Sequence, residues 1–390
     1  MPLRVRNAVV LVKPESTPGV DAAPVAGTDA VLVEVTGNPF SFDPNVIQTN
    51  EVTGSLDGRG AIIGGMRASL RFRAYMKGAA APGTTAPEWG KLLKACGCSE
   101  TLTAAAVGGP TAATAGTGTT VTAQAPFGTT QDQYKGMPLH ISGTPAAAYP
   151  IITGYTTGRV ATLTDLFNPV LSASAMLQIP PNALYKPAST GISNHTIWMY
   201  LDGLLYKFVG AIGTAQMSIG SGGPGMFDFT FSGLFTSKTD AAVPTATYDT
   251  TRPPVWRDSG GNDMSNALLD RVKSGIASFS LDLGNTIAYP ENPSNLEGLD
   301  PPLITARRIT GSVDPIEELV ATRDLMARFR AQTQIIMHAR LGDTAGNRLA
   351  LTVPNALILN QAPGDRQGLA TVTVPFEAVG QDSGFYLAVY

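Results

Sequence analysis

The side chains best suited to nucleophilic attack, general-base catalysis or zinc binding are few: two cysteines and three histidines. Cys96 and Cys98 are two residues apart, too close for a disulfide that closes a long stabilising loop. A tetrahedral metal site needs about four ligands, and His140, His195 and His338 come from distant segments. We therefore predict two reduced thiols, no metal site and no need for an oxidising compartment.

No candidate active site emerges from the remaining motifs. His195 opens a predicted strand without a partner motif, and His140 and His338 fit the alternation of predicted strands. The glycine-rich run 220–225 lacks a Gly-Lys-Ser/Thr ending and enters a strand, whereas a phosphate loop opens a helix. The turn 343–347 carries no complete calcium-loop pattern. We predict a protein without catalytic, cofactor-binding or metal-binding residues, and not an enzyme.

The composition is poor in charge, with 15% charged and 43% hydrophobic residues among 390. Two interpretations fit: a surface buried against other subunits, or a β-rich surface of Thr, Ser, Gly and Asn. The net charge is −3 and no cluster of Lys and Arg appears. This excludes a phosphate-gripping groove but allows passive contact with DNA. Arg67, Arg71 and Arg73 fit a solvated or subunit-facing strand edge better than a nucleic-acid contact.

The N-terminal sequence has no apolar signal region, and no stretch approaches about 18 uninterrupted apolar residues. We therefore expect synthesis and assembly in a cytoplasm, without membrane contact.

Short strands dominate the predicted order of elements. Residues 13–29 contain three prolines and are predicted as an extended arm rather than a packed element. A helix begins at Pro87, where Trp89, Leu92, Leu93 and Cys96 share one face and Gly97 ends it. Residues 101–125 are predicted as a linker or floppy strand, and about 132–185 as a small all-β module. A second helix is predicted from Pro315 to about Arg330, capped by Asp314 and Glu317. The predicted strands are 30–35, 46–52, 66–76, 196–201, 204–210, 215–219, 226–231, 276–283, 303–310, 333–341, 348–353, 356–359 and 370–376.

Two short motifs occur twice, which predicts an internal duplication. Residues 53–57 (TGSLD) are repeated as 310–314 (TGSVD), and 225–231 resembles 368–374. The two motifs lie much farther apart in the first copy (53–57 and 225–231) than in the second (310–314 and 368–374), which places an insertion in the first copy. We predict a mainly β fold with flanking helices, in which 1–100 joins 186–240 as one β domain. Residues 101–185 form an inserted β module, and 250–390 form the second domain.

This order of motifs resembles the tail tube (major tail) proteins of long non-contractile-tailed bacteriophages, the siphophages. The resemblance spans most of the chain outside 101–185. The residues that carry it are the proline-rich arm ending at Thr28-Asp29-Ala30, then 51–59, 64–66, 86–89, 308–315 and 365–369.

The resemblance implies two tandem tail-tube-like β-sandwich or barrel domains and a structural virion protein without cofactors. In this family, subunits close into rings whose inner strands line a channel for genome delivery. The rings stack through the arm, here about 13–29 within an N-terminal arm of about 1–29, and a long hairpin, here about 37–65. Two domains per chain predict trimeric, pseudo-hexameric rings with an external inserted module and an acidic or neutral lumen. The implied partners are other copies of the chain, tape measure, tail terminator and distal tail proteins, and DNA in passage.

Two structural alternatives remain at this point. A capsid or capsid-decoration protein would share the low charge and the β content, but would lack tandem domains and a stacking arm. An extracellular adhesin or glycan-binding module would carry a signal peptide and clustered surface aromatic residues, which we do not find.

Overall fold

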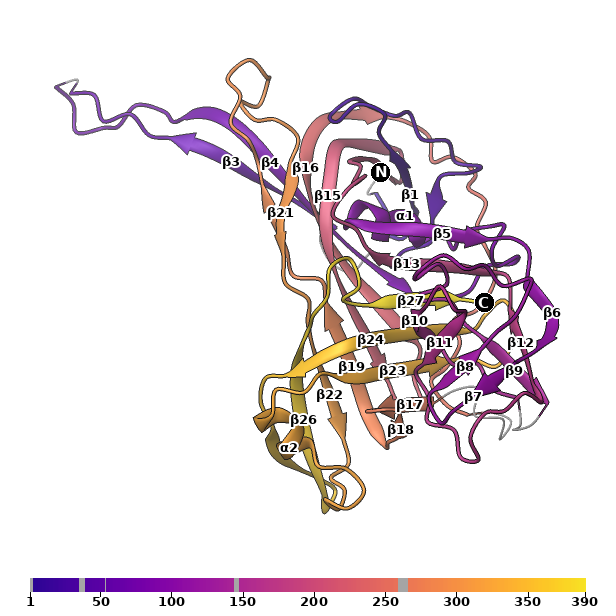
Figure 1. Cartoon of the computed structure of the whole chain (residues 1–390). Helices are drawn as coiled ribbons and strands as arrows, with labels where there is room; N and C mark the ends of the chain where they lie inside the picture. Colours follow the sequence, from indigo (N-terminus) through magenta and orange to yellow (C-terminus); the bar gives the residue numbers. More distant parts are fainter. Residues whose placement is uncertain (1–2, 35–38, 53, 144–146, 259–265) are drawn as a thin grey trace.

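A computed structural model of the chain describes residues 3–34, 39–52, 54–143, 147–258 and 266–390. Almost all regular structure is antiparallel β, which confirms the mainly β fold class. Long strands form one side of the molecule, a group of short strands lies on the opposite side, and a hairpin projects from the body (Figure 1).

Eight antiparallel strands form one continuous sheet that includes strands from both halves of the chain. In spatial order they are β3 (Phe40–Ile47), β4 (Ile62–Tyr75), β16 (Gly225–Asp240), β15 (Leu204–Gly220), β19 (Ile276–Asp282), β22 (Thr310–Pro315), β26 (Leu369–Ala378) and β25 (Ala362–Arg366). The register between β15 and β19 pairs Gln216 with Asp282. This sheet therefore joins the first half of the chain to the second through main-chain pairing.

The alternation of side chains along β4 is as predicted. Leu70 and Phe72 point into the core, whereas Arg67, Arg71 and Arg73 are exposed on the other face. Strands β16 and β26 alternate in the same way, so these three strands have one apolar and one polar face.

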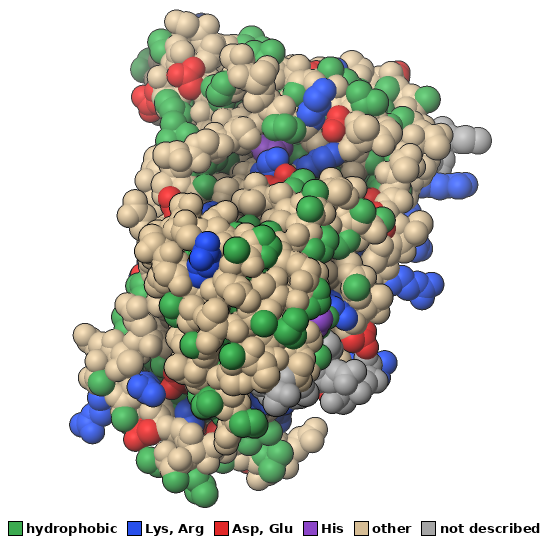
Figure 2. Space-filling model, turned by 45° about the vertical axis from the view of Figure 1, so that its right-hand side comes forward, with side chains coloured by type: hydrophobic (Ala, Val, Ile, Leu, Met, Phe, Trp, Pro, Cys, Tyr) green, Lys and Arg blue, Asp and Glu red, His purple; other side chains and the backbone are tan. Residues whose placement is uncertain are grey.

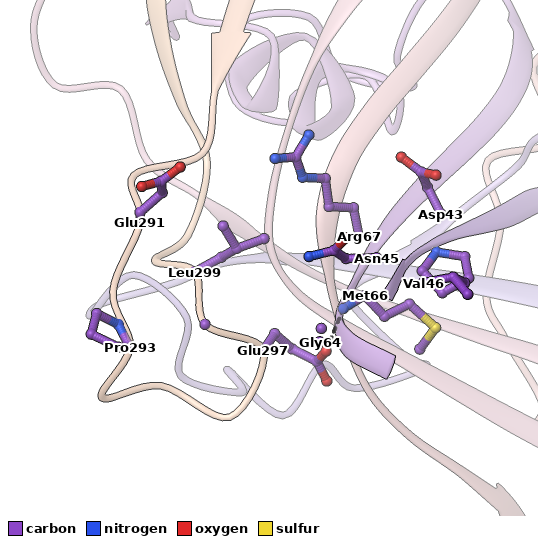
Figure 3. A pocket seen from close by; sticks show the side chains of 13 residues that line it. Asp43, Asn45, Val46, Gly64, Met66, Arg67, Glu291, Pro293, Glu297 and Leu299 are labelled. Carbon is purple, nitrogen blue, oxygen red and sulfur yellow. Dashed lines mark hydrogen bonds between the residues drawn. The ribbon is translucent and has the colours of Figure 1, made fainter. Parts of the chain in front are cut away.

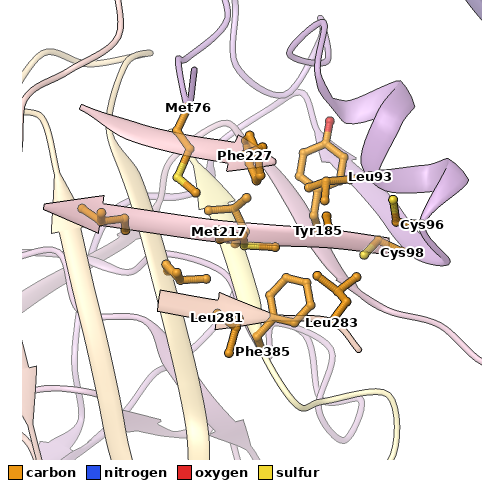
Figure 4. Close-up of a cluster of buried hydrophobic side chains, with 14 of the residues drawn as sticks. Met76, Leu93, Cys96, Cys98, Tyr185, Met217, Phe227, Leu281, Leu283 and Phe385 are labelled. Carbon is orange, nitrogen blue, oxygen red and sulfur yellow. The ribbon is translucent and has the colours of Figure 1, made fainter. Parts of the chain in front are cut away.

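The apolar face packs on a core that contains residues of both halves. Phe227 and Met217 lie beside Leu281 and Phe385 in this cluster (Figure 4). Helix α1 (Gly90–Ala95) covers one end, burying the side chains predicted for it, and Gly97 leaves the helix at a φ of 75°. Because α1 and both halves share this cluster, the core joins the two halves rather than separating them.

A second layer closes the sandwich on the other side of this core. Its strands are ordered β5 (Cys98–Thr103), β13 (Asn182–Pro187), β27 (Tyr386–Val389), β24 (Leu349–Ile358), β23 (Ile335–Leu341), β17 (Asn266–Leu269) and β18 (Val272–Lys273). Strands β14 (His195–Leu201), β1 (Ala8–Pro14) and β2 (Ala30–Val31) continue outward from β15, and β20 (Asn285–Ala288) pairs with β21 (Leu303–Arg307).

The strands between β5 and β13 form two small sheets whose core also includes Leu184, Tyr386 and Tyr390 of the body. One contains β10 (Ile152–Tyr155), β11 (Val160–Leu163), β8 (Thr120–Thr122) and β7 (Ala115–Gly116); the other contains β6 (Val107–Ala112), β12 (Ala175–Ile179) and β9 (His140–Gly143). Of the two alternatives predicted for 101–125, the linker is wrong, because this segment contains strands. The small Ala, Thr and Gly side chains of this segment pack in ordered strands, and Val121 is fully buried.

The prediction that residues 13–29 are an unpacked arm is also wrong for the isolated chain. Glu15 is buried, and its carboxylate accepts hydrogen bonds from the Thr196 hydroxyl at 2.9 Å and the Gly210 N–H at 2.7 Å. Asp21 accepts from the Trp198 indole and pairs with Lys207. Because burying a carboxylate is costly unless it is hydrogen-bonded, these contacts hold the segment on β14 and β15.

The second helix begins ten residues later than predicted. Helix α2 spans Leu325–Arg330, and the Asp324 carboxylate accepts from the Ala327 N–H at its start. Pro315 instead ends strand β22, and the next N–H, of Ile316, donates to Gly275 at 2.9 Å. Asp314 forms an ion pair with Arg366 rather than a helix cap.

The TGSLD and TGSVD motifs occupy different structures, so their proposed correspondence is wrong. Residues 310–314 lie within β22, whereas the described residues 54–57 lie in the exposed tip of the β3–β4 hairpin. The predicted match of 225–231 with 368–374 is displaced by two residues, because the three alternating buried side chains are 227, 229 and 231 in β16 but 372, 374 and 376 in β26. In the first half Phe229 lies opposite Phe72, and in the second Val374 lies opposite Val313.

Candidate functional site

The polar face of the eight-stranded sheet is the most extended candidate for a functional surface. Cross-strand pairing aligns one residue from each of six strands into a row that crosses both halves. The row runs through Arg73, Asp228, Gln216, Asp282, Thr310 and Glu377. Sequence alternation suggests which residues share a face, but only the register shows that these six are neighbours.

Positive and negative side chains on this face are balanced and largely paired. The arginines are Arg67, Arg71, Arg73, Arg308 and Arg366, and the carboxylates are Asp43, Asp228, Asp282, Asp314 and Glu377. Arg73 pairs with Asp228, and Arg308 donates to Glu377 at 2.9 Å. The hydrogen bond from Arg308 lowers the pKa of the Glu377 carboxyl, so that side chain stays ionised and neutralises its partner.

The sheet ends in two strands that have a neighbour on one side only among the described residues. Strand β3 pairs with β4, and β25 pairs with β26. Both strands are exposed. Unpaired edge strands normally invite pairing with another chain, and proteins that avoid it use short or interrupted edges.

The hairpin formed by β3 and β4 projects from the body and carries exposed apolar side chains (Figure 1). Val52 and Leu56, at its tip, are fully exposed, and Ile62 and Ile63 are more than half exposed. Apolar side chains at the end of a long projecting hairpin are typical of an interface that is empty in the isolated chain.

A cleft of about 720 Å³ lies at the base of this hairpin, beside the loop 289–299 of the second half (Figure 3). The Glu297 carboxylate accepts from the Met66 N–H at 2.7 Å, and the Arg67 guanidinium lies 5.1 Å from the centre of the Tyr289 ring. Gly65 has a φ of 138°, and a Cβ there would lie 2.3 Å from the Glu297 carbonyl oxygen. These contacts fix the hairpin relative to the body, and the cleft holds no nucleophile beside a general base.

The three histidines lie apart, in strands that serve the packing. His195 is buried at the start of β14, where its Nδ1–H donates to the Ser193 carbonyl at 3.0 Å. His338 is buried in β23 and contacts the Thr352 hydroxyl, and His140 in β9 stacks on Tyr149 at 4.5 Å. Simple alternation does not describe β23, whose residues are all buried, because its second face contacts the inserted module, where Arg340 pairs with Asp165.

His195 gives a pH-dependent stability. Burial lowers its pKa to about 4, whereas an unfolded histidine keeps a pKa of about 6.5, so the unfolded chain takes up the proton first as the pH falls. We expect the contribution of His195 to the free energy of unfolding to be constant above this range and lower by about 2 kcal/mol at pH 5. Urea titrations of the unassembled chain at pH 7.5 and 5 measure this.

The matched variant His195→Gln should lose this part of the pH dependence and keep the part due to His338, whose pKa burial also lowers. An unchanged difference between the two pH values in His195→Gln would contradict the assignment.

The two cysteines are free and buried, and burial raises the pKa of both thiols, that of Cys98 to about 12. No group of three or more His, Cys, Asp or Glu side chains suited to a metal ion occurs in the described part of the chain. The same residues contain no helix with the length and hydropathy of a membrane span.

The low charge of the sequence corresponds to an uncharged polar surface on the face that Figure 2 shows. Neutral polar side chains and backbone prevail there, with apolar and charged side chains scattered between them. This face therefore agrees with the second interpretation of the composition.

Comparison with known proteins agrees with this arrangement. No curated protein matches the sequence. A family model described as phage tail tube protein matches residues 5–378, which is nearly the whole chain and includes the eight-stranded sheet, its hairpin and the inserted strands. The chain therefore belongs to the phage tail tube protein family and is a structural component of the virion tail.

Proposed function

We propose that this protein polymerises as stacked rings into the tail tube of a long-tailed phage and forms the channel through which the genome is delivered. The observation that supports this is the eight-stranded sheet, which has a core face, a polar face and, at each end, a strand that pairs on one side only among the described strands. Such a sheet can continue from chain to chain around a closed ring. Its charge-balanced face would then line the channel and let DNA slide past without holding it.

Each ring contains three chains in this proposal. The equivalent pairing of β4 with β16 and of β22 with β26 supports two tandem tail-tube-like domains per chain, hence six per ring. Three chains contribute 24 strands, and a spacing of about 4.8 Å gives a circumference of roughly 115 Å. The corresponding diameter, about 37 Å before strand tilt, admits duplex DNA.

Electron microscopy of the purified protein tests this function. We expect annular oligomers or hollow tubes whose class averages contain three chains per ring. Six full chains per ring would contradict the trimer, and a persistent compact monomer, or monomers that decorate capsids, would contradict the tube. Tape measure, tail terminator and distal tail proteins are the further partners we propose, at the inside and the two ends of the tube.

The inserted strands lie on the opposite side of the molecule from the eight-stranded sheet (Figure 1), which supports an external module. We expect a chain without the module to assemble into tubes of normal diameter. The deletion has to spare β5 and β13, which belong to the body, so it removes 104–181 rather than 101–185. Thr103 and Asn182 lie opposite one another, so an Asn-Gly turn can join them.

The module covers residues of the body that the deletion exposes. Arg340 is nearly inaccessible and its guanidinium lies 3.0 Å from the Asp165 carboxylate of the module. Without the module this cation is open to water and carries no burial cost, so it is left unchanged, whereas the side chains of Leu184, Tyr386 and Tyr390 become exposed apolar surface. Tube assembly by this variant is measured by electron microscopy, and loss of all assembly from a folded variant would exclude a purely external role.

A further inference from the structure

We propose that rings close by antiparallel pairing of β3 of one chain with β25 of the next, with Ser41 opposite Ala362. This inference rests on the proposed function and names the contact that the ring requires. Both strands are exposed, and each has one partner among the described strands. The chain also contains a template for the contact, because β15 and β19 already join the first half to the second in the same way.

The template gives the register. Phe229 lies opposite Phe72, and Val374 lies opposite Val313, so we treat Phe229 as equivalent to Val374 and Phe72 as equivalent to Val313. Asp228 is then equivalent to Thr373. Their partners on the next strands, Gln216 of β15 and Ala362 of β25, are therefore equivalent as well.

The other side of the junction follows in the same way. Asp282 is the β19 partner of Thr310, and Ser41 is the β3 partner of Ser69, the residue equivalent to Thr310. The observed pair Gln216–Asp282 therefore predicts the pair Ala362–Ser41 between neighbouring chains.

The main-chain groups of both edges suit this register. The Arg71 N–H donates to the Pro39 carbonyl at 2.7 Å, so the N–H and C=O of Phe40 and Phe42 face the free edge of β3. On β25, a two-residue turn at 367–368 makes Arg366 and Leu369 a hydrogen-bonded pair.

By the same alternation the groups of Gln361 and Pro363 face the free edge of β25. The proposed register sets Phe42 opposite Gln361 and Phe40 opposite Pro363. The main-chain groups that point outward from β3 then face those that point outward from the β25 edge. A slip by one residue would turn them away from each other. Pro363 lacks an N–H, and the Gln361 N–H already donates to the side-chain oxygen of Asn360 at 2.8 Å. Each pair therefore forms a single hydrogen bond, from the N–H of Phe40 or Phe42 to the carbonyl opposite.

On the core side of the proposed junction the apolar Phe40 meets Pro363, whereas Phe42 meets the polar Gln361. Phe42 lies on the core side of β3 with 39% of its surface exposed, beside the edge that β25 would cover. Pro363 and Gln361 lie on the core side of β25, because Pro363 pairs with the buried Val372. Ser41 and Ala362 lie on the polar face and would extend the lining of the channel.

Cysteine cross-linking of the assembled protein tests the contact. Opposed residues of antiparallel strands have Cα atoms about 4.5–5.5 Å apart, within the range a disulfide spans. Ser41→Cys with Ala362→Cys in one chain should give, on mild oxidation of rings, covalent species of two and three chains and none larger. Cys96 and Cys98 are buried and should not contribute.

Two matched controls accompany this variant. Gln216→Cys with Asp282→Cys, the internal template pair, should oxidise within one chain and give no covalent oligomer. Ser41→Cys with Gly364→Cys, two residues out of register, should cross-link at least tenfold less. Rings that form normally without cross-links in the in-register variant would overturn the strand pairing while leaving the tube intact. Failure of the unmodified chain to form any ring would overturn the tube and this contact with it.

Discussion

A tube built from the double variant Asp228→Asn, Glu377→Gln is expected to retain duplex DNA that the unmodified tube releases. The two substitutions remove the partners of Arg73 and Arg308 on the polar face of the sheet. Each chain then gains two uncompensated positive charges on the proposed channel wall. Every phosphate contacted by a freed arginine steepens the slope of log binding constant against log salt concentration by about 0.9. DNA retention should therefore rise on the order of tenfold at low salt, and this increase should vanish at high salt.

The measurement is the binding of short duplex DNA to purified tubes between about 50 and 200 mM salt, the range over which such contacts weaken strongly. Both ion pairs are largely exposed, and pairs of this kind contribute about 0–1 kcal/mol, so the variant should fold and assemble. The control Asp132→Asn removes the partner of Lys135 in the inserted module, one charge per chain instead of two, and should leave DNA binding unchanged. Equal DNA release by the double variant and the unmodified tube would show that this face does not line the channel.

Removal of the hairpin tip is expected to separate ring formation from tube formation. Ile47 and Ile62 lie opposite one another, so residues 48–61 can be replaced by an Asn-Gly turn without disturbing β3 or β4. The shortened chain loses the fully exposed Val52 and Leu56, each of which contributes about 1.5–3 kcal/mol when buried in an interface. We expect single rings and no tubes, measured by sedimentation velocity and electron microscopy.

A milder variant, Val52→Ser with Leu56→Ser, keeps the length of the hairpin and should raise the protein concentration needed for stacking without affecting ring closure. Tubes of ordinary length from the shortened chain would assign stacking to another surface.

Local patterns in the sequence predicted the parts of the fold that depend on one face of one element. The alternation of Leu70 and Phe72 with Arg71 and Arg73 located β4, and the spacing of Leu92 and Leu93 located α1. Where a distant residue decides the structure, the prediction failed. Glu15 is held by partners 181 and 195 positions away, so the proline-rich composition of its segment said nothing about its packing.

The motif comparison failed for a related reason. Five similar residues at 53–57 and 310–314 do not specify which strands a segment pairs with. The second copy lies between the two strands β19 and β26, whereas the described residues 54–57 lie in a hairpin tip. The domain boundaries predicted from that comparison remain a proposal, now supported by the equivalent pairing of β16 and β26 instead.

The candidate surface could be predicted in character but not in detail. Its neutrality follows from the low charge and the absence of basic clusters. Its specific ion pairs do not follow from the composition, because Arg73 and Asp228 are 155 positions apart in the sequence, and Arg308 and Glu377 are 69 positions apart. Cross-strand neighbours of this kind are set by register, which depends on the packing of every strand between them.

The junction between β15 and β19 forms within one polypeptide, which changes how a ring assembles. In the proposed ring, three of the six junctions are complete as soon as each chain has folded, at any protein concentration. Of the other three, two form by association of separate chains and carry the loss of translational and rotational freedom, an estimated 4–15 kcal/mol for each association, and the third closes the ring. Joining two repeats in one chain should therefore let rings nucleate in more dilute solution than six separate subunits would allow.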